Sequence, residues 1–168
     1  MTLNVNVSTP TSFELHLGRI PTATTEETRD VVLQLFGSVI PSIDVTGIDV
    51  PWMGTRARRD SSGGYDFQDW MVNFFVNSDF SNWKTLYDWI MYVAEENPLP
   101  SAHNITAILY IKDNFGKIVL KIVFLMVWIR NLGEVTLNTQ SSEEFLQCSA
   151  SFEYARYDVY LPNEAMIG

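Results

Sequence analysis

The side chains that most often carry out chemistry in enzymes are few and scattered in this sequence. The chain has two histidines, His16 and His103, and one cysteine, Cys148. Neither histidine has a second histidine or a cysteine at the spacing of a metal site. A cysteine–histidine nucleophilic pair is formally possible, but Cys148 alternates onto the apolar face of its predicted strand, where a buried structural thiol is expected. We therefore predict no metal site, no cofactor and no catalytic residue.

Two carboxylates, Asp66 and Asp69, lie close together in the sequence. They are three positions apart in a segment predicted to be extended, so their side chains should point to opposite faces and not converge on a substrate. The Ser-Gly-Gly-Tyr run at residues 62–65 does not follow a strand and open a helix, as a phosphate-binding loop does. An enzymatic function therefore has no support in the sequence.

Composition describes an acidic, apolar-rich chain of 168 residues with a net charge of −9. Nucleic-acid grooves need clustered lysine and arginine, so specific DNA binding is not expected. Residues 1–10 lack the basic start and apolar run of a signal peptide, which predicts synthesis in a reducing cytoplasm. The longest apolar run, residues 118–129, is interrupted by Lys121 and is shorter than the roughly 20 residues of a membrane helix. Aromatic residues make up 13% of the chain, which suits either an aromatic core or a subunit interface.

Alternating apolar and polar residues predict a chain made mainly of strands. Closely spaced turns favour antiparallel pairing, so we expect an α+β fold with a sandwich or barrel of about seven or eight strands. One flanking helix is predicted at residues 82–96, capped by Asp79 or Ser81, with Trp89 and Val93 beside its main apolar stripe. That stripe is formed by Trp83, Leu86, Tyr87, Ile90 and Ala94. The strands are expected at residues 13–17, 31–36, 67–76, 105–111, 117–128, 134–137 and 145–157, with an extended segment at 41–51 and turns at 113–116 and 131–133.

The predicted strand at residues 117–128 is apolar on both faces except at Lys121. A sheet with one solvated face would show alternation, so this strand needs a cover on each side. The core supplies one cover, and either the helix or a neighbouring subunit supplies the other. The face assigned to a neighbouring subunit comprises Val119, Val123, Leu125 and Val127.

Residues 52–65 are predicted to form a protruding hairpin or loop. The segment carries the only dense basic run of the chain and then the turn-rich sequence Asp-Ser-Ser-Gly-Gly at residues 60–64. On an acidic protein, such a segment can contact the acidic surface of another copy, or it can simply be a solvated loop. The residues singled out for contact are Trp52, Arg56, Arg58, Arg59, Asp60 and Tyr65.

The last predicted strand has one apolar and one polar face. Leu146, Cys148, Ala150, Phe152 and Tyr154 alternate with Gln147, Ser149, Ser151 and Glu153. The second set forms a polar stripe, which suits either an outer solvated face or the lining of a channel.

Several short motifs, taken in order, resemble the tail tube proteins of T4-like contractile-tailed phages. The resemblance begins with Gly-Tyr-Asp-Phe-Gln-Asp-Trp at residues 64–70, Asn-Ser-Asp at 77–79 and the helix with Trp83, Leu86 and Trp89. It extends to the strand at 13–17, to residues 41–56, to Leu-Gly-Glu-Val-Thr-Leu at 132–137, to Glu-Phe at 144–145 and to Phe-Glu-Tyr-Ala-Arg-Tyr at 152–157. These motifs are short, and their order, spacing and the chain length carry the resemblance over about residues 13–158.

The resemblance implies a single tail-tube domain over residues 1–168, with short flexible ends at residues 1–10 and 160–168. It implies hexameric rings that stack into a hollow tube inside a sheath, assembled in the host bacterial cytoplasm and carried in the virion. Its partners would be further copies, the sheath, tape measure, baseplate and tail-terminator proteins, with DNA passing through unspecifically and no membrane insertion.

In that assembly residues 52–65 would stack the rings, and the polar stripe would line the lumen. The alternatives are the tube of a type VI secretion or extracellular contractile injection system, a baseplate protein that initiates the tube, and a small-molecule-binding barrel.

Overall fold

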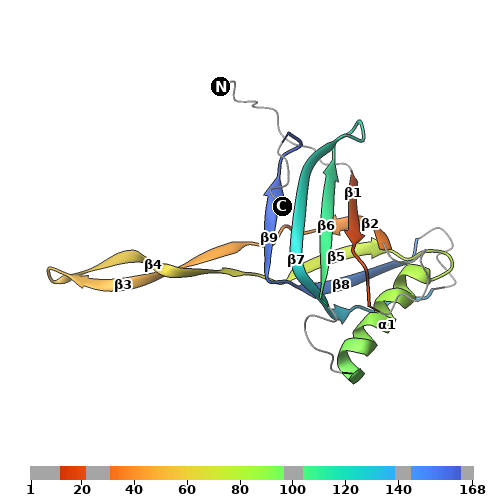
Figure 1. Ribbon diagram of the computed structural model, residues 1–168, viewed down its shortest axis with the longest axis horizontal. Coiled ribbons are helices and arrows are strands. Elements are labelled where there is room, and N and C mark those ends of the chain that lie inside the picture. Colours follow the sequence, from red (N-terminus) through yellow and green to blue (C-terminus); the bar gives the residue numbers. More distant parts are fainter. Residues whose placement is uncertain (1–11, 22–30, 97–103, 139–144, 164–168) are drawn as a thin grey trace.

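The computed structural model describes residues 12–21, 31–96, 104–138 and 145–163. Within these ranges the chain forms nine strands and one helix (Figure 1). All strand pairs are antiparallel, which confirms the predicted α+β, mainly β class. The strands are β1 (Ser12–Leu17), β2 (Val31–Ser38), β3 (Ile43–Trp52), β4 (Thr55–Phe67), β5 (Trp70–Phe75), β6 (Ile105–Lys112), β7 (Ile118–Leu132), β8 (Gln147–Glu153) and β9 (Arg156–Tyr160), and the helix is α1 (Ser81–Glu96).

Six strands close into a barrel. The sheet runs in the order β6-β1-β2-β5-β8-β7, and the pairing of β6 with β7 joins its two ends. The seventh strand, β9, pairs with Lys121–Leu125 of β7, on the edge where β8 pairs with Trp128–Leu132, while β3 and β4 form a separate two-stranded hairpin. Of the two architectures expected from the sequence, the structure is therefore a barrel, and closure removes most of its open edges.

The barrel interior is filled by the inward residues of each strand. Leu15, Leu33, Phe74, Leu109 and Phe152 are all buried, as the period-two alternation of their strands requires. At the centre Trp70 stacks on Phe124, with ring centroids 3.8 Å apart and planes inclined by 5°. The indole N–H of Trp70 donates to Ser38 Oγ at 3.2 Å, so this buried ring keeps a polar partner.

Strand β7 changes its inward face at Met126. Ile122 and Phe124 point into the barrel, and so do Val127 and Ile129. In a regular strand the even-numbered and odd-numbered residues would point to opposite faces. Met126 has a positive φ of 57°, and the register with β6 shifts between Ile105 and Ala107. One extra residue in a strand forms a bulge and reverses which face the following residues occupy.

This bulge corrects the predicted interface face. Val127 belongs to the core of its own barrel and Val123 is also buried, whereas Val119 is exposed and Leu125 is half-buried. The four side chains therefore do not form one surface. The predicted turn at residues 131–133 is also wrong, because β7 continues to Leu132 and pairs with β8 there.

Two further boundaries differ from the prediction. The turn of the basic hairpin is Met53-Gly54, both with positive φ, while residues 60–64 belong to strand β4. Residues 145–157, expected as one strand, are divided between β8 and β9 by a break at Tyr154 and Ala155. After this break the chain pairs with the first half of β7 as β9, whereas β8 pairs with the second half.

Helix α1 lies beside the barrel and contacts β7 (Figure 1). Its buried face is centred on Leu86 and Trp89, whereas Tyr87, placed on the predicted stripe, is 40% exposed. The face is thus rotated from the predicted one toward Trp89 and Val93, which packs partly against the core. The predicted caps contribute as expected, since Asp79 Oδ1 accepts from the Ser81 N–H at 3.0 Å.

Asn82 fixes the connection between β5 and α1. Its amide is buried, accepts hydrogen bonds from the N–H groups of Asn77 at 3.0 Å and Trp83 at 2.8 Å, and donates to the Phe75 carbonyl at 2.8 Å. A buried group with all these partners is costly to remove, because three backbone groups lose a partner together.

We expect Asn82→Ala to lower the free energy of unfolding by about 2 kcal/mol. Thermal denaturation followed by circular dichroism measures the change. The exposed Asn114 offers a matched control, since Asn114→Ala should leave the midpoint unchanged. An unchanged midpoint for Asn82→Ala would show that these hydrogen bonds do not hold the helix to the sheet.

Candidate assembly surfaces

Among the described residues, no side chains are arranged as a catalytic or metal centre. No group of three or more metal-ligating side chains occurs in the ranges that the structure covers. Cys148 is buried, its Sγ lies 3.4 Å from the Gly133 carbonyl, and burial raises the pKa of its thiol. Asp66 lies in β4 and Asp69 follows it, and the two carboxylates share no described partner. His103 falls outside the described residues.

His16 takes part in a small polar cluster on the outer face of β1 and β6. Glu14 pairs with Lys112 Nζ at 2.6 Å and with His16 Nε2 at 3.5 Å, and the His16 ring meets the Tyr110 ring edge-on. The hydrogen bond from Lys112 lowers the pKa of the Glu14 carboxyl. This arrangement is an ordinary cross-strand ion pair and not a nucleophile with its base.

The basic segment projects from the barrel as the long hairpin β3–β4 (Figure 1). Arg56 pairs with Pro51, Arg58 with Asp49 and Arg59 with Ile48, so Arg56 and Arg58 share one face and Arg59 lies on the other. All three arginines are exposed near the tip, and Arg58 Nε is 4.0 Å from Asp49 Oδ1. Trp52 ends β3, and Asp60 lies in β4 opposite Gly47.

The base of the hairpin continues the aromatic core outward. Phe67 contacts Tyr154 and Tyr157, whose rings contact Phe124, and Tyr65 packs edge-on against Phe67 with centroids 5.1 Å apart. Two tyrosine hydroxyls hold this junction: Tyr154 donates to the Gln68 carbonyl at 2.7 Å and Tyr157 to the Pro41 carbonyl at 2.8 Å. Burial raises the pKa of Tyr154 to about 12, so the donor keeps its proton at any physiological pH.

The hairpin leaves apolar side chains uncovered. On the face that carries Tyr65, Ile43 and Val45 are half or more exposed, and Ile48 near the tip is 49% exposed. An isolated two-stranded hairpin is marginally stable in water, and exposed apolar strands invite pairing with another chain. This surface is therefore suited to contact with another molecule.

The polar stripe on β8 forms as predicted. Cys148, Ala150 and Phe152 are buried, and Gln147, Ser149, Ser151 and Glu153 alternate onto the opposite face. Neighbouring strand β5 extends this face, since Asn73 pairs with Ser149 and Met71 with Ser151.

One cation that the sequence did not single out joins this stripe. Arg130 Nη1 donates to Glu153 Oε1 and to Asp69 Oδ2, both at 2.8 Å. Arg130 lies in β7, Glu153 in β8 and Asp69 just before β5, and the pairing of β8 with both β7 and β5 brings the three together. Arg130 is thus held between two carboxylates beside the polar stripe of β8.

This fold also occurs in solved structures of other proteins. No family model and no curated protein matches the chain. Among solved structures, the sheath/tube terminator of an extracellular contractile injection system named PVC aligns with a TM-score of 0.68 at 12% identity, covering 93% of this chain and 99% of that one. The tube-terminating cap of the anti-feeding prophage aligns with a TM-score of 0.65 at 13% identity, covering 96% of each chain.

An Hcp1 protein shows the same likeness. Hcp1 of E. coli EAEC 042 aligns with a TM-score of 0.57 at 9% identity over 90% of this chain and 92% of that one. None of these structures is described as an enzyme, and no helix among the described residues is long and apolar enough to cross a membrane. The chain therefore has the fold of the tube components of contractile injection systems and of the Hcp1 proteins.

Proposed function

We propose that this protein is the structural subunit of the tail tube of a contractile phage. Six copies form a ring, rings stack into a hollow tube, and the tube lies inside a sheath. It holds a tape measure protein and later conducts the genome. The tube role is supported by the alignment of over nine-tenths of the chain with components of contractile injection systems, and the phage assignment is supported by the tail-tube motifs of the sequence.

The surface of the subunit supports self-assembly. Apolar side chains remain exposed on the closed barrel and its hairpin, among them Val39, Val45, Tyr65 and Met71. Of these, Val45 and Tyr65 are cross-strand partners on the hairpin, and exposed apolar patches mark interaction sites. A six-fold arrangement is supported by one of the solved structures with this fold, the anti-feeding prophage baseplate, which was determined with six-fold symmetry.

The other proposed partners follow from the assemblies in which this fold occurs. One solved relative is a sheath–tube complex, and others are a baseplate and a terminating cap, which supports contact with sheath, baseplate and terminator proteins. The mature location is then the virion tail, after assembly in the host cytoplasm.

A second candidate function is the tube of a type VI secretion or extracellular contractile injection system. The solved structures with this fold favour it directly, because they come from such systems. A baseplate protein that initiates the tube is a third form of the same role. Neighbouring genes distinguish the phage from the others: terminase and capsid genes indicate a phage, and secretion or toxin genes indicate an injection system.

The purified protein is expected to form rings and stacked tubes. Negative-stain electron microscopy with sedimentation velocity measures both species. Copies should associate because the exposed apolar surface of one copy is removed from water by the next. A stable monomer at high protein concentration, with no annular or tubular species, would refute the proposed function.

A further inference from the structure

The β3–β4 hairpin continues a pair of barrel strands beyond the barrel (Figure 1). β3 follows β2 and β4 leads into β5, so the hairpin and the β2–β5 pair are successive parts of one antiparallel ribbon. Residues 39–42 and 68–69 interrupt this ribbon between its two parts. At the interruption the Gln68 N–H donates to the Ser42 carbonyl at 3.3 Å, which is long for such a bond. Backbone pairing of this kind does not set the angle between the hairpin and the barrel.

This angle matters because the hairpin is long. β3 has 10 residues, and at about 3.3 Å per residue it extends roughly 33 Å. A tilt of about 10° at the base would therefore move the tip by roughly 6 Å, which is more than the length of any single contact. A hairpin that is free to tilt would also lose that freedom when its tip binds another molecule, and this loss lowers affinity.

Two tyrosines at the end of β8 and in β9 hold both legs of the hairpin to the barrel. The Tyr157 hydroxyl donates to the carbonyl of Pro41, shortly before β3, at 2.8 Å. The Tyr154 hydroxyl donates to the carbonyl of Gln68, directly after β4, at 2.7 Å. Each hydroxyl therefore acts on one leg, at the point where the ribbon is interrupted.

The rings of these tyrosines are held in turn by the barrel. Tyr154 and Tyr157 contact Phe124 with ring centroids 5.1 and 5.4 Å apart, and Phe124 stacks on the buried Trp70. Both tyrosine rings also contact Phe67, the last residue of β4. This packing restricts the two rings, so their hydroxyls lie at defined positions relative to the core.

An ion pair offers a further contact at the second leg. Asp69, next to Gln68, pairs with Arg130 of β7 at 2.8 Å. The two side chains are 59% and 52% exposed, and ion pairs in solvent contribute little stability and are screened by salt. The direction of the hairpin is therefore better assigned to the tyrosines than to this pair.

We propose that the Tyr154 and Tyr157 hydroxyls set the direction of the β3–β4 hairpin relative to the barrel. They are positioning residues, because they act on the hairpin through the carbonyls of its two legs. Their consequence for ring stacking rests on the proposed function. A hairpin held in one direction presents its tip to the next ring without first having to be ordered.

The double variant Tyr154→Phe, Tyr157→Phe removes both hydroxyls and keeps both rings. Spin labels on Met53→Cys, at the exposed tip, and on Asn114→Cys, in the exposed β6–β7 turn, report the direction of the hairpin as a distribution of distances. The native Cys148 is buried, which directs the labels to the two new thiols. Labelled protein is diluted in unlabelled copies, so that distances within one subunit are measured. The wild type should give a narrow distribution, and the double variant a broad one.

Tyr110→Phe is the matched control, because Tyr110 lies on β6 and its ring contacts His16 and not the hairpin. Its distance distribution should stay narrow, and so should that of the wild type at high salt. The near-UV circular dichroism of the double variant should match the wild type, since the aromatic core remains. A narrow distribution in the double variant would overturn the inference. Loss of the near-UV signal would also overturn it, because the hydroxyls would then hold the barrel itself.

Assembly gives a second readout. The double variant should still form rings, but it should need roughly tenfold more protein to form tubes, because its hairpins must be ordered on stacking. Tubes at the wild-type concentration from a variant with a broad distribution would show that stacking does not depend on the hydroxyls. A wild type that forms neither rings nor tubes would refute the proposed function, and the distances within one subunit would still test the role of the tyrosines.

Discussion

Replacing Arg56, Arg58 and Arg59 together with glutamate is expected to abolish long tubes while single rings still form. The three arginines are exposed near the tip of a hairpin that projects away from the barrel (Figure 1). The chain carries a net charge of −9, so we expect another copy to meet this basic tip with an acidic surface. Like charges placed against each other at an interface cost several kcal/mol, which is enough to prevent stacking.

The measurement is the length distribution of tubes in negative stain, with sedimentation velocity to count rings. Replacing the same three residues with lysine is the matched control, because it keeps the charge and the length of the side chains. That control should retain tubes, shortened only where bidentate arginine contacts matter. Raising the salt concentration should shorten wild-type tubes, since exposed charge pairs are screened. Normal tube lengths for the glutamate variant would show that the hairpin tip takes no part in the stacking contact.

Deleting residues 58–63 would test the hairpin less specifically than substitution. The turn-rich sequence at residues 60–64 predicts a loop that a deletion would merely shorten. It instead forms part of strand β4, where Arg58 pairs with Asp49 and Arg59 with Ile48. Deleting it would unpair β3 and remove the hairpin as a whole. A loss of tubes could then not be attributed to the arginines.

Much of the fold was predictable because the burial of one strand face leaves a clear record in the sequence. In β8 the alternation of Cys148, Ala150 and Phe152 with serine and glutamate follows directly from a sheet with one face in the core. The β6–β7 turn was predictable from Asp-Asn-Phe-Gly, since Asp113 caps it and Gly116 supplies a positive φ. The helix bounds followed from its caps and from the prolines beyond it.

The errors occur where tertiary contacts override a local pattern. Met126 takes a positive φ although it is neither glycine nor asparagine. The residue types therefore did not indicate the bulge that turns Val127 inward. Trp89 becomes the buried centre of α1 because the barrel lies on that side, and the helical spacing alone allowed a face centred on Ile90. The glycines at residues 63 and 64 suggested a turn, but they lie in β4 at an irregularity of its pairing with β3.

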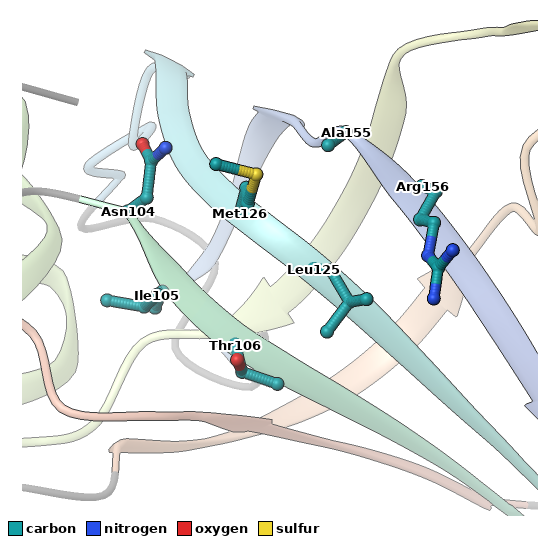
Figure 2. A pocket seen from close by; sticks show the side chains of 7 residues that line it. All are labelled: Asn104, Ile105, Thr106, Leu125, Met126, Ala155 and Arg156. Carbon is teal, nitrogen blue, oxygen red and sulfur yellow. The ribbon is translucent and has the colours of Figure 1, made fainter. Parts of the chain in front are cut away.

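The contacts within the candidate surfaces could not be predicted from the sequence for a different reason. Arg130, Asp69 and Glu153 are far apart in the chain and each reads as an ordinary surface charge. The opening lined by Ile105, Met126 and Arg156 depends on a bulge, a strand break and the start of another strand meeting in space (Figure 2). Such sites arise from topology, and a single sequence records no signal for them.

Changing Ser149 and Glu153 to lysine is expected to make DNA adhere to the tube and to slow its passage. If the outer face of β8 lines the lumen, the wild-type stripe presents serines, glutamine and a glutamate that holds Arg130. Such a surface offers few free cationic groups that could bind phosphate. The double lysine variant adds two cations in each copy, removes a carboxylate and leaves Arg130 with Asp69 alone, so counterion release would favour DNA binding.

Binding of short duplex DNA to assembled tubes, measured across a range of salt concentrations, tests this directly. The lysine variant should bind with an affinity that falls steeply as salt rises, whereas wild-type tubes should bind weakly at all concentrations. The neutral pair Ser149→Ala and Glu153→Gln is the control for lost hydrogen bonds, and it should behave like the wild type. In phage particles the lysine variant should assemble normally and release its genome more slowly. If its tubes neither retain DNA nor delay release, the β8 face lies on the outside of the tube, and another face of the barrel lines the channel.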